Sequence, residues 1–394
     1  MKTAVVGCGV AGLAAALALH RRGHRVTLLE AFEQPRPMGS GLLLQPSGLA
    51  ALRSLGLLDP ALALGARVER LDGRDLNGRR PMNMSYGAWR PGGFGLGIHR
   101  ASLFGLLHDA TRAEGIEIRT GAEVTGFDRL ESPSLTDAVG RAHGPFDLVV
   151  VADGSASQLR GLLRPRSRAP LYPWGAVWAN ARDLDGRFSG ALHQRYDRAS
   201  TMVGVLPIGA GPDGARDLVS VFWSLPRSQM DDFFAGDLTG WQARVLVIWP
   251  ETEPLLAQFA GPLDFSRATY RDVSVGRWSA GAFVLIGDAA HGTSPQLGQG
   301  ANLGLVDAVE LGLRVEAPEH LARYQRSRRG QTAPYQLMSR ALTPLFQSHG
   351  WLGPAVRRWL FAPLAQAPAL RRVAAHVLTG VFRLGPTPEE LRPD

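Results

Sequence analysis

The sequence has almost no cysteine and almost no lysine. Cys8 is the only cysteine among 394 residues, so no intramolecular disulfide can form, which is typical of a reducing compartment and predicts a cytoplasmic protein. Lys2 is the only lysine among 43 basic residues, and the arginines are scattered rather than clustered with aromatic residues. The net charge of +8 therefore indicates no nucleic-acid partner. We interpret it as a bias of genome composition, with attraction of an anionic cofactor or an acidic substrate as the alternative.

Long apolar runs, repeats and metal-ligand patterns are also missing. No stretch reaches the roughly 18 apolar residues of a membrane span, and no set of His, Cys, Asp or Glu residues has the spacing of a metal site. The N-terminal stretch MKTAVVGCGVAGLAAALALHRRGH could pass for a signal peptide, but its regularly spaced glycines and the strand-like RVTLLE that follows argue against export. With 45% hydrophobic and 20% charged residues, the composition is that of an ordinary globular protein.

The first motif is GCGVAG, which follows a strand-like run and opens a helix-like run. Gly7 permits a tight turn, Gly9 lets the backbone approach a pyrophosphate, and Gly12 lets the helix and the strand pack closely. A second predicted strand completes a βαβ unit and ends at Glu30, whose carboxylate can hold ribose hydroxyls. Because an acid there disfavours a 2′-phosphate, this site is predicted to bind FAD or NAD rather than NADP.

Two further motifs follow buried-strand patterns. In DLVVVADGSASQLR, the pair Asp153 and Gly154 comes directly after a strand, and in GDAAHGTSPQLGQGAN the pair Gly287 and Asp288 does the same. The second of these loops leads into an apolar helix. Helix starts carry unpaired N–H groups and partial positive charge, so this loop is expected to meet an electron-rich ligand.

The fold class expected from these patterns is α/β. Between about 168 and 277 the sequence becomes rich in Trp, Tyr, Pro and short strand-like runs, which predicts an inserted, mainly antiparallel sheet. Prolines such as Pro334 and Pro344 are expected to divide the C-terminal region into short helices. The expected parts are a Rossmann-like nucleotide-binding domain (1–71, 96–167 and 278–330), a substrate domain (72–95 and 168–277) and a helical C-terminal segment (331–394).

Three motifs in this order, with a β-rich insertion between the last two, resemble the group A flavoprotein monooxygenases of the para-hydroxybenzoate hydroxylase type. The resemblance covers nearly the whole chain to about residue 340. It implies bound FAD, NADH or NADPH as a transient reductant, and hydroxylation of a small aromatic substrate by O2 through a flavin C4a-hydroperoxide. The chain has no second GxGxxG, which fits a family that binds the nicotinamide without a second Rossmann domain.

The resemblance also implies roles for single residues. Glu30 is expected to bind the ribose and Asp288 the ribityl hydroxyls, while the helix starting near Gly300 aims its N–H groups at the flavin pyrimidine edge. Pro295, Gly298, Gln299 and Gly300 are expected to line the pocket beside the ring. The implied cofactor contacts are Gly7, Gly9, Val10, Ala11, Gly12, Glu30, Ala31, Arg100, Val124, Asp153, Gly154, Gly287, Asp288, Gly300, Ala301 and Asn302.

Several of these residues have a simpler interpretation. Arg100 can be a surface helix residue, and Asp153 a turn acid, because Asp-Gly is a turn signal in any protein. His291 is interpreted as part of the motif's scaffold rather than as an acid–base group. Cys8 is interpreted as packing, because no second cysteine exists for redox pairing.

Substrate contacts are expected from the inserted sheet. Alternation places Met202, Gly204 and Leu206 on one face and Val203 and Val205 on the other, without showing which face looks at the flavin. The expected substrate residues are Trp178, His193, Met202, Phe222 and Trp223. Core packing is the alternative for each of them, because aromatic side chains are commonly buried.

Other functions stay open on the sequence alone. A reductase or dehydrogenase of an isoprenoid or polyketide-type substrate would use the same FAD site, and halogenation is disfavoured because the expected early lysine is missing. A flavin-bearing binding protein is a different class, in which basic amphipathic stretches such as AVRRWLF and ALRRVAAHVL would contact a partner. The same stretches can instead cover the flavin domain or form a homodimer face.

Overall fold

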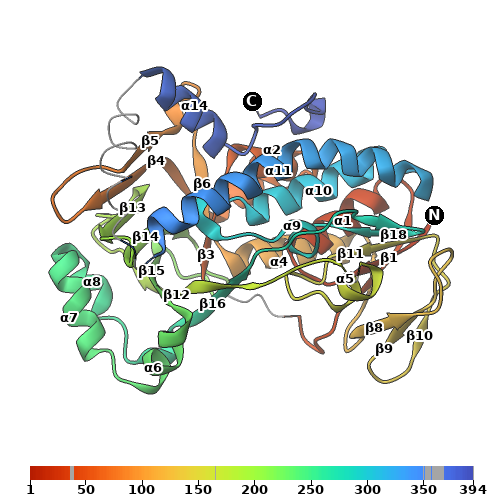
Figure 1. Ribbon diagram of the computed structural model, residues 1–394, viewed down its shortest axis with the longest axis horizontal. Coiled ribbons are helices and arrows are strands. Elements are labelled where there is room, and N and C mark those ends of the chain that lie inside the picture. Colours follow the sequence, from red (N-terminus) through yellow and green to blue (C-terminus); the bar gives the residue numbers. More distant parts are fainter. Residues whose placement is uncertain (36–39, 165, 349, 351–355, 357–367, 394) are drawn as a thin grey trace.

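A parallel sheet forms the centre of one lobe of the computed structural model (Figure 1). The structure describes residues 1–35, 40–164, 166–348, 350, 356 and 368–393. The strand order is β17 (Ser279–Ala280), β18 (Phe283–Leu285), β11 (Leu148–Val151), β1 (Lys2–Val6), β2 (Arg25–Leu29) and β7 (Glu117–Arg119). All neighbours are parallel except β17 and β18. The valine- and leucine-rich strand sequences reflect burial on both faces.

Helices pack against this sheet. They include α1 (Val10–His20), α4 (Arg100–Ala113), α5 (Gln158–Leu163) and α10 (Gly300–Arg314). The α1 helix is buried from Gly12 to Leu19 because its residues are almost all small or apolar, and α10 is buried from Asn302 to Gly312. The strands and helices share one hydrophobic core. A small antiparallel sheet of β8 (Val124–Phe127), β9 (Leu135–Asp137) and β10 (Ala142–His143) lies at the edge of this lobe (Figure 1).

The second lobe is built on a nine-stranded sheet that is mainly antiparallel. Its order is β16 (Ser266–Arg271), β12 (Leu171–Arg182), β15 (Leu218–Pro226), β14 (Thr201–Gly209), β13 (Gly190–Asp197), β4 (Ala66–Asp75), β6 (Gly95–His99) and β3 (Gly41–Leu44), with β5 (Met82–Ser85) paired to β4. Only β13 and β4 are parallel neighbours. Because β3 and β6 fall within segments that the sequence assigned to the nucleotide-binding domain, one sheet spans both expected domains, and their boundaries stay a prediction.

The two faces of this sheet have different surroundings. The outer face carries Val203, Val205, Val221 and Trp223, which share a core with the helical segment 230–256. That segment contains α6 (Met230–Ala235), α7 (Thr239–Ile248) and α8 (Glu253–Leu256). The opposite face, called the inner face below, carries Trp178, Met202 and Phe222 by alternation. On this face Ser220 contacts Ser40 and Ser224 accepts Nε2 of Gln347 at 3.0 Å.

The expectation of short C-terminal helices is wrong for the described part of the chain. Helix α11 (Leu321–Phe346) runs for 26 residues through both Pro334 and Pro344. Pro334 cannot donate to the carbonyl of Gly330, which would normally be a costly loss. That carbonyl instead accepts the backbone N–H of Leu384 at 2.8 Å, so a distant segment replaces the missing bond. Pro354 and Pro363 lie outside the described residues.

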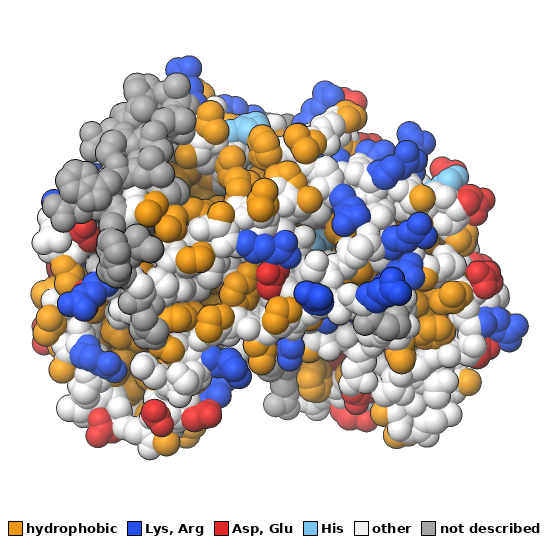
Figure 2. Space-filling model, viewed as in Figure 1, with side chains coloured by type: hydrophobic (Ala, Val, Ile, Leu, Met, Phe, Trp, Pro, Cys, Tyr) orange, Lys and Arg blue, Asp and Glu red, His pale blue; other side chains and the backbone are white. Residues whose placement is uncertain are grey.

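The remaining helices cover the sides of the molecule. They include α2 (Pro46–Ser54), α3 (Leu58–Leu64), α9 (Asp288–His291) and α14 (Pro368–Leu378). Within the described ranges, no helix is both long and apolar enough to cross a bilayer, and no group of three potential ligand side chains could hold a metal ion. Basic side chains are dispersed among apolar and uncharged ones on the face drawn in Figure 2.

Candidate functional site

The three motif turns meet at one edge of the parallel sheet. Strands β1, β11 and β18 are parallel, with β11 between the other two, so the turns that follow them emerge on the same side. A Cβ atom added to Gly7 would lie 2.6 Å from the carbonyl oxygen of Ala152, and one added to Gly287 would lie 3.0 Å from Cβ of Ala11. The first turn therefore touches both the second and the third.

The three glycines of the first motif have different environments. Gly7 has a φ of +101°, a conformation that side chains rarely adopt, which confirms its tight turn. A Cβ on Gly12 would lie 1.9 Å from the carbonyl oxygen of Gly7, which confirms its close packing. A Cβ on Gly9 would meet nothing within 4 Å. This open space at the start of α1 is where a pyrophosphate could reach the backbone amides, so the residues present fit the expected nucleotide.

Glu30 fixes the first turn from the end of the neighbouring strand. Its Oε2 accepts the backbone N–H of Cys8 at 2.7 Å, and its Oε1 accepts that of Phe32 at 3.0 Å. Each carboxylate oxygen keeps a second lone pair, which a ribose hydroxyl can use. Burial, together with the charge of Glu30, raises the pKa of the Cys8 thiol to about 12. A neutral, buried thiol agrees with the packing role expected for Cys8.

The second turn contains an unpartnered acid. One carboxylate oxygen of Asp153 is buried without a hydrogen-bond partner, and burial raises the pKa of this group. Nearby, Arg160 donates through Nη2 to the carbonyl of Ser155 at 2.9 Å and through Nη1 to that of Ala289 at 3.2 Å. Arg160 therefore joins the second turn to the third, and Asp153 keeps acceptor capacity for a ligand hydroxyl.

The third turn presents Asp288 to the solvent in front of helix α10. Asp288 is exposed, and its Oδ1 lies 3.7 Å from the position of a Cβ added to Gly300. Pro295 and Gly298 are also exposed. The first turn of α10 contains no acidic residue that would neutralise its N–H groups. This arrangement suits a ligand that places hydroxyls on the acid and an electron-rich edge on the helix start.

Two residues expected at the cofactor site or the adjoining pocket instead use their side chains for support. Asn302 is fully buried, with Oδ1 accepting the backbone N–H of Gln45 at 2.8 Å and Nδ2 donating to the carbonyl of Gly298 at 2.9 Å. Gln299 is 2% exposed and donates through Nε2 to the carbonyl of Leu378 at 2.7 Å. Only the backbones of these two residues are left to line the pocket.

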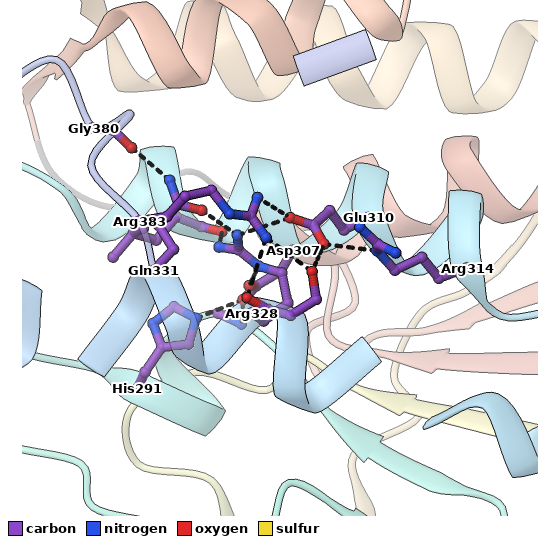
Figure 3. A network of polar contacts seen from close by, with 11 residues as sticks. His291, Asp307, Glu310, Arg314, Arg328, Gln331, Gly380 and Arg383 are labelled. Carbon is purple, nitrogen blue, oxygen red and sulfur yellow. Dashed lines mark hydrogen bonds and ion pairs between the residues drawn. The ribbon is translucent and has the colours of Figure 1, made fainter. Parts of the chain in front are cut away.

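A buried ionic network holds the third turn from behind (Figure 3). Nε2 of His291 lies 2.5 Å from Oδ2 of Asp307, and the same oxygen accepts the backbone N–H of Gly287 at 2.7 Å. Oδ1 of Asp307 accepts Nε of Arg328 at 2.7 Å. Because His291 is 1% exposed and paired in this way, the structure gives it the scaffold role expected from the sequence.

The network continues along α10 to Glu310. This carboxylate pairs with Arg328 at 3.3 Å, Arg383 at 2.6 Å and Arg314 at 3.0 Å (Figure 3). Burial alone would raise the pKa values of Asp307 and Glu310, but the cations around them hold both below their usual range. Sequence reasoning missed this network because its charged partners come from segments far apart in the chain.

Other expected cofactor residues lie around the same edge. Arg100 is exposed in the first turn of α4, where its backbone N–H donates to the carbonyl of Ser40 at 2.8 Å. Ala31 is exposed two residues after the end of β2, while Val124 is buried at the start of β8. Val10 and Ala11 are half-buried in the first turn of α1, as is Ala301 in that of α10.

The structure separates the expected substrate residues into two groups. His193 and Trp223 lie on the outer face, where their ring centroids are 6.4 Å from Trp249 and 6.1 Å from Trp241, respectively. They therefore cannot share a cavity with inner-face residues such as Phe222. The physical reason is the two-residue period of a strand, which sends Phe222 and Trp223 to opposite sides of the sheet.

The inner face brings together aromatic and uncharged polar groups. The rings of Trp178 and Phe222 are stacked with centroids 4.5 Å apart, and Met202 is half-buried on the next strand. Sequence reasoning missed Asn180, which is exposed two residues beyond Trp178 and contacts Nε2 of His99 at 2.9 Å. Asn180 and Trp178 are two residues apart in one strand, so their side chains lie on the same face, and this spacing would have identified Asn180.

Comparisons with known proteins agree with this geometry. The chain matches the model of the FAD binding domain over residues 1–329. It is 30% identical over 368 residues to the phenazine 1,6-dicarboxylic acid hydroxylase PhzS of Lysobacter antibioticus, covering 83% of this chain and 86% of that one. It is 28% identical to the 3-hydroxybenzoate 6-hydroxylase of Polaromonas naphthalenivorans, covering 88% of each chain.

The fold has a solved counterpart as well. The structure of Klebsiella pneumoniae HpxO complexed with FAD and uric acid superimposes with a TM-score of 0.80 at 20% identity, covering 96% of this chain and 97% of that one. Converging nucleotide turns beside a large antiparallel sheet thus define an FAD-dependent oxidoreductase. The chain belongs to the class A flavoprotein monooxygenases, as the three motifs predicted.

Proposed function

We propose that the protein hydroxylates an uncharged aromatic substrate, using NADH or NADPH and O2. The observation that carries this proposal is the absence of charged side chains in the three central, fully described cross-strand rows of the inner face of strands β12 to β15, whereas Arg182 lies at the end of β12. In the central rows, alternation and strand pairing put the following side chains on that face: Ala176, Trp178, Asn180, Leu192, Gln194, Tyr196, Met202, Leu206, Ser220, Phe222 and Ser224. Arg195, the charged residue of these rows, pairs with Val203 and belongs to the outer face.

A carboxylated substrate would be costly on such a surface. An anion removed from water needs a cation or several hydrogen-bond donors to compensate for its lost hydration. The two hydroxylases named above act, by their names, on a dicarboxylic acid and on a hydroxybenzoate. On the inner face of this chain, Trp178 and Phe222 instead offer stacking surface and exclusion of water, while Asn180 offers one neutral polar contact.

The same proposal assigns the cofactor contacts. The backbone at Gly9 would meet the pyrophosphate, Glu30 the ribose, Asp153 and Asp288 further hydroxyls, and the amides at Gly300 the negative edge of the reduced ring. Bound FAD supplies the redox chemistry, and the balanced reaction converts NAD(P)H, a proton, O2 and the aromatic compound into NAD(P)⁺, water and the hydroxylated product. The backbone from Pro295 to Gly300 and the inner face would together exclude bulk water from the reacting atoms.

A matched pair of substrates tests the charge preference. We expect 4-hydroxyquinoline to accelerate NAD(P)H-dependent bleaching of the bound flavin more than its 2-carboxylate does, with O2 consumed in step. Replacing Met202, which is half-buried on the inner face, by arginine should reduce this preference, whereas Met202→Gln is the uncharged control. Equal acceleration by both compounds in the unmodified protein would contradict the proposal. Product formation without O2 consumption would instead favour a reductase.

Three further expectations stay predictions. The choice between NADH and NADPH is decided by comparing the two in the same bleaching assay. The homodimer is tested by sedimentation of the purified protein. The cytoplasmic location, expected from the single cysteine, is tested by fractionation of the source cells.

A further inference from the structure

The last residues of α14 and the segment that follows them are attached to the elements around the third turn through consecutive backbone carbonyls. We name residues 377–384 the C-terminal strap. The carbonyls of its first four residues accept, in order, Oη of Tyr335 at 2.7 Å, Nε2 of Gln299 at 2.7 Å, the backbone N–H of Ser47 at 3.0 Å, and Nε2 of Gln331. The strap therefore contacts α2, the start of α10 and α11 within four residues.

Two of these contacts fall at helix starts. Gln299 is the residue before α10, and Ser47 is in the first turn of α2, whose N–H groups have no partner within the helix. Asn302 links the same two helix starts, because it accepts the N–H of Gln45 and donates to the carbonyl of Gly298. The strap closes this arrangement from outside, next to the loop that contains Pro295 and Gly298.

The far end of the strap is fixed by charge. Arg383 donates through Nη1 to Glu310 at 2.6 Å and through Nη2 to Oγ of Ser327 at 2.8 Å. Leu384 then donates to the carbonyl of Gly330, the bond that Pro334 leaves open. With both ends held, the bond from Gln299 to Leu378 can define where the first turn of α10 lies.

We propose that Gln299 is a positioning residue, which acts through the C-terminal strap to hold the N-terminus of α10 against the flavin ring. This inference rests on the proposed function, which puts the pyrimidine edge of FAD at that helix start. The partial positive charge there stabilises a reduced, negatively charged flavin, and its effect declines steeply with distance. Loosening α10 should therefore weaken FAD binding and make the flavin reduction potential more negative.

The test replaces Gln299 by methionine, which has a similar length and no donor. Tyr335→Phe is the control, because it removes the two bonds of Oη to the strap, at the carbonyl of Val377 and the N–H of Phe382, and leaves the bond from Gln299 to Leu378 in place. Purified variants are compared for the dissociation constant of FAD, for the flavin reduction potential measured spectroelectrochemically, and for the thermal unfolding midpoint. We expect Gln299→Met to lower the potential and to weaken FAD binding by up to about tenfold, the limit reached when the whole contribution of one buried hydrogen bond is lost from the bound state. Tyr335→Phe should lower only the unfolding midpoint.

The outcomes separate the two proposals. If Gln299→Met leaves FAD affinity and potential unchanged, or if Tyr335→Phe changes both by the same amount, the strap only stabilises the fold and the inference is overturned. Rescue by Gln299→Asn is not expected, since its shorter side chain cannot reach Leu378 without moving the helix start. If the unmodified protein binds FAD but hydroxylates no aromatic compound, the proposed function fails, whereas the affinity and potential readouts still decide the role of Gln299.

Discussion

The backbone N–H of Gly287 donates to Oδ2 of Asp307 across 2.7 Å, although Gly287 opens the third nucleotide turn and Asp307 lies in the middle of α10. The same oxygen contacts His291, so one carboxylate holds both ends of the short helix that carries Asp288. The geometry of the turn therefore depends on a buried charge that has no direct access to the ligand.

Replacing Asp307 by asparagine should destabilise the protein and weaken FAD binding. Removing one partner of a buried ion pair costs about 3–5 kcal/mol, because Arg328 is left without full compensation. Urea unfolding of the apoprotein measures this change. Arg340→Gln is the control on α11, since its pair with Asp272 is exposed at the surface and should contribute about 0–1 kcal/mol. Equal destabilisation by both variants would contradict the assigned role of Asp307.

The network also predicts sensitivity to acid. Cations around Asp307 and Glu310 hold the pKa values of both carboxyls below their ordinary values of 3.8 and 4.5. A carboxyl with a lowered pKa contributes stability above its unfolded value, and this contribution is lost as the pH falls through the folded value. Urea unfolding should therefore show declining stability below about pH 5. The combined change of Asp307 to Asn and Glu310 to Gln should flatten this decline, and an unchanged slope would exclude the network as its source.

The first motif predicts opposite effects for two neighbouring glycines. Gly12→Ala should disrupt folding, because its Cβ would lie 1.9 Å from the carbonyl oxygen of Gly7. Gly9→Ala should leave the apoprotein as stable as the unmodified protein, because its Cβ meets nothing within 4 Å, but should weaken FAD binding. Thermal unfolding and FAD titration of both variants check this. If Gly9→Ala binds FAD normally, the pyrophosphate does not lie over that residue.

Cys8 should be unreactive in the folded protein. It is 3% exposed, and its pKa is raised to about 12 by burial and by the charge of Glu30, so almost no thiolate exists at neutral pH. A thiol reagent such as DTNB should label it slowly in the native state and stoichiometrically in guanidinium chloride. Rapid labelling of the native protein would show that the first turn opens in solution.

The sequence was sufficient for the nucleotide turns because their chemistry is local. A glycine that needs positive φ, such as Gly7, and an acid placed after a buried strand, such as Asp288, are visible without the fold. The rule that parallel strands end at a common edge then brings the turns together. Side-chain alternation is equally local, and it alone assigned the residues of the inserted sheet to two opposite faces.

Long-range contacts account for what the sequence did not predict. Alternation cannot say that Val203 faces the helices while Met202 lies on the opposite face, because that depends on where the segment 230–256 packs. The local rule for Pro334 predicted a helix end, and it failed because Leu384 supplies the missing donor from a distant segment. Similarly, Gln299 was expected to line the pocket, but its side chain bonds to Leu378 instead.

Titration of the apoprotein with FAD tests the central claim most directly, which is that three separate turns hold one flavin dinucleotide. We predict binding of one FAD per chain with quenching of flavin fluorescence, and a large loss of affinity in Asp288→Ala, the exposed acid of the third turn. The claim is contradicted if the apoprotein binds no FAD. It is also contradicted if Asp288→Ala binds FAD as tightly as the unmodified protein does and NAD binds with the same affinity as FAD.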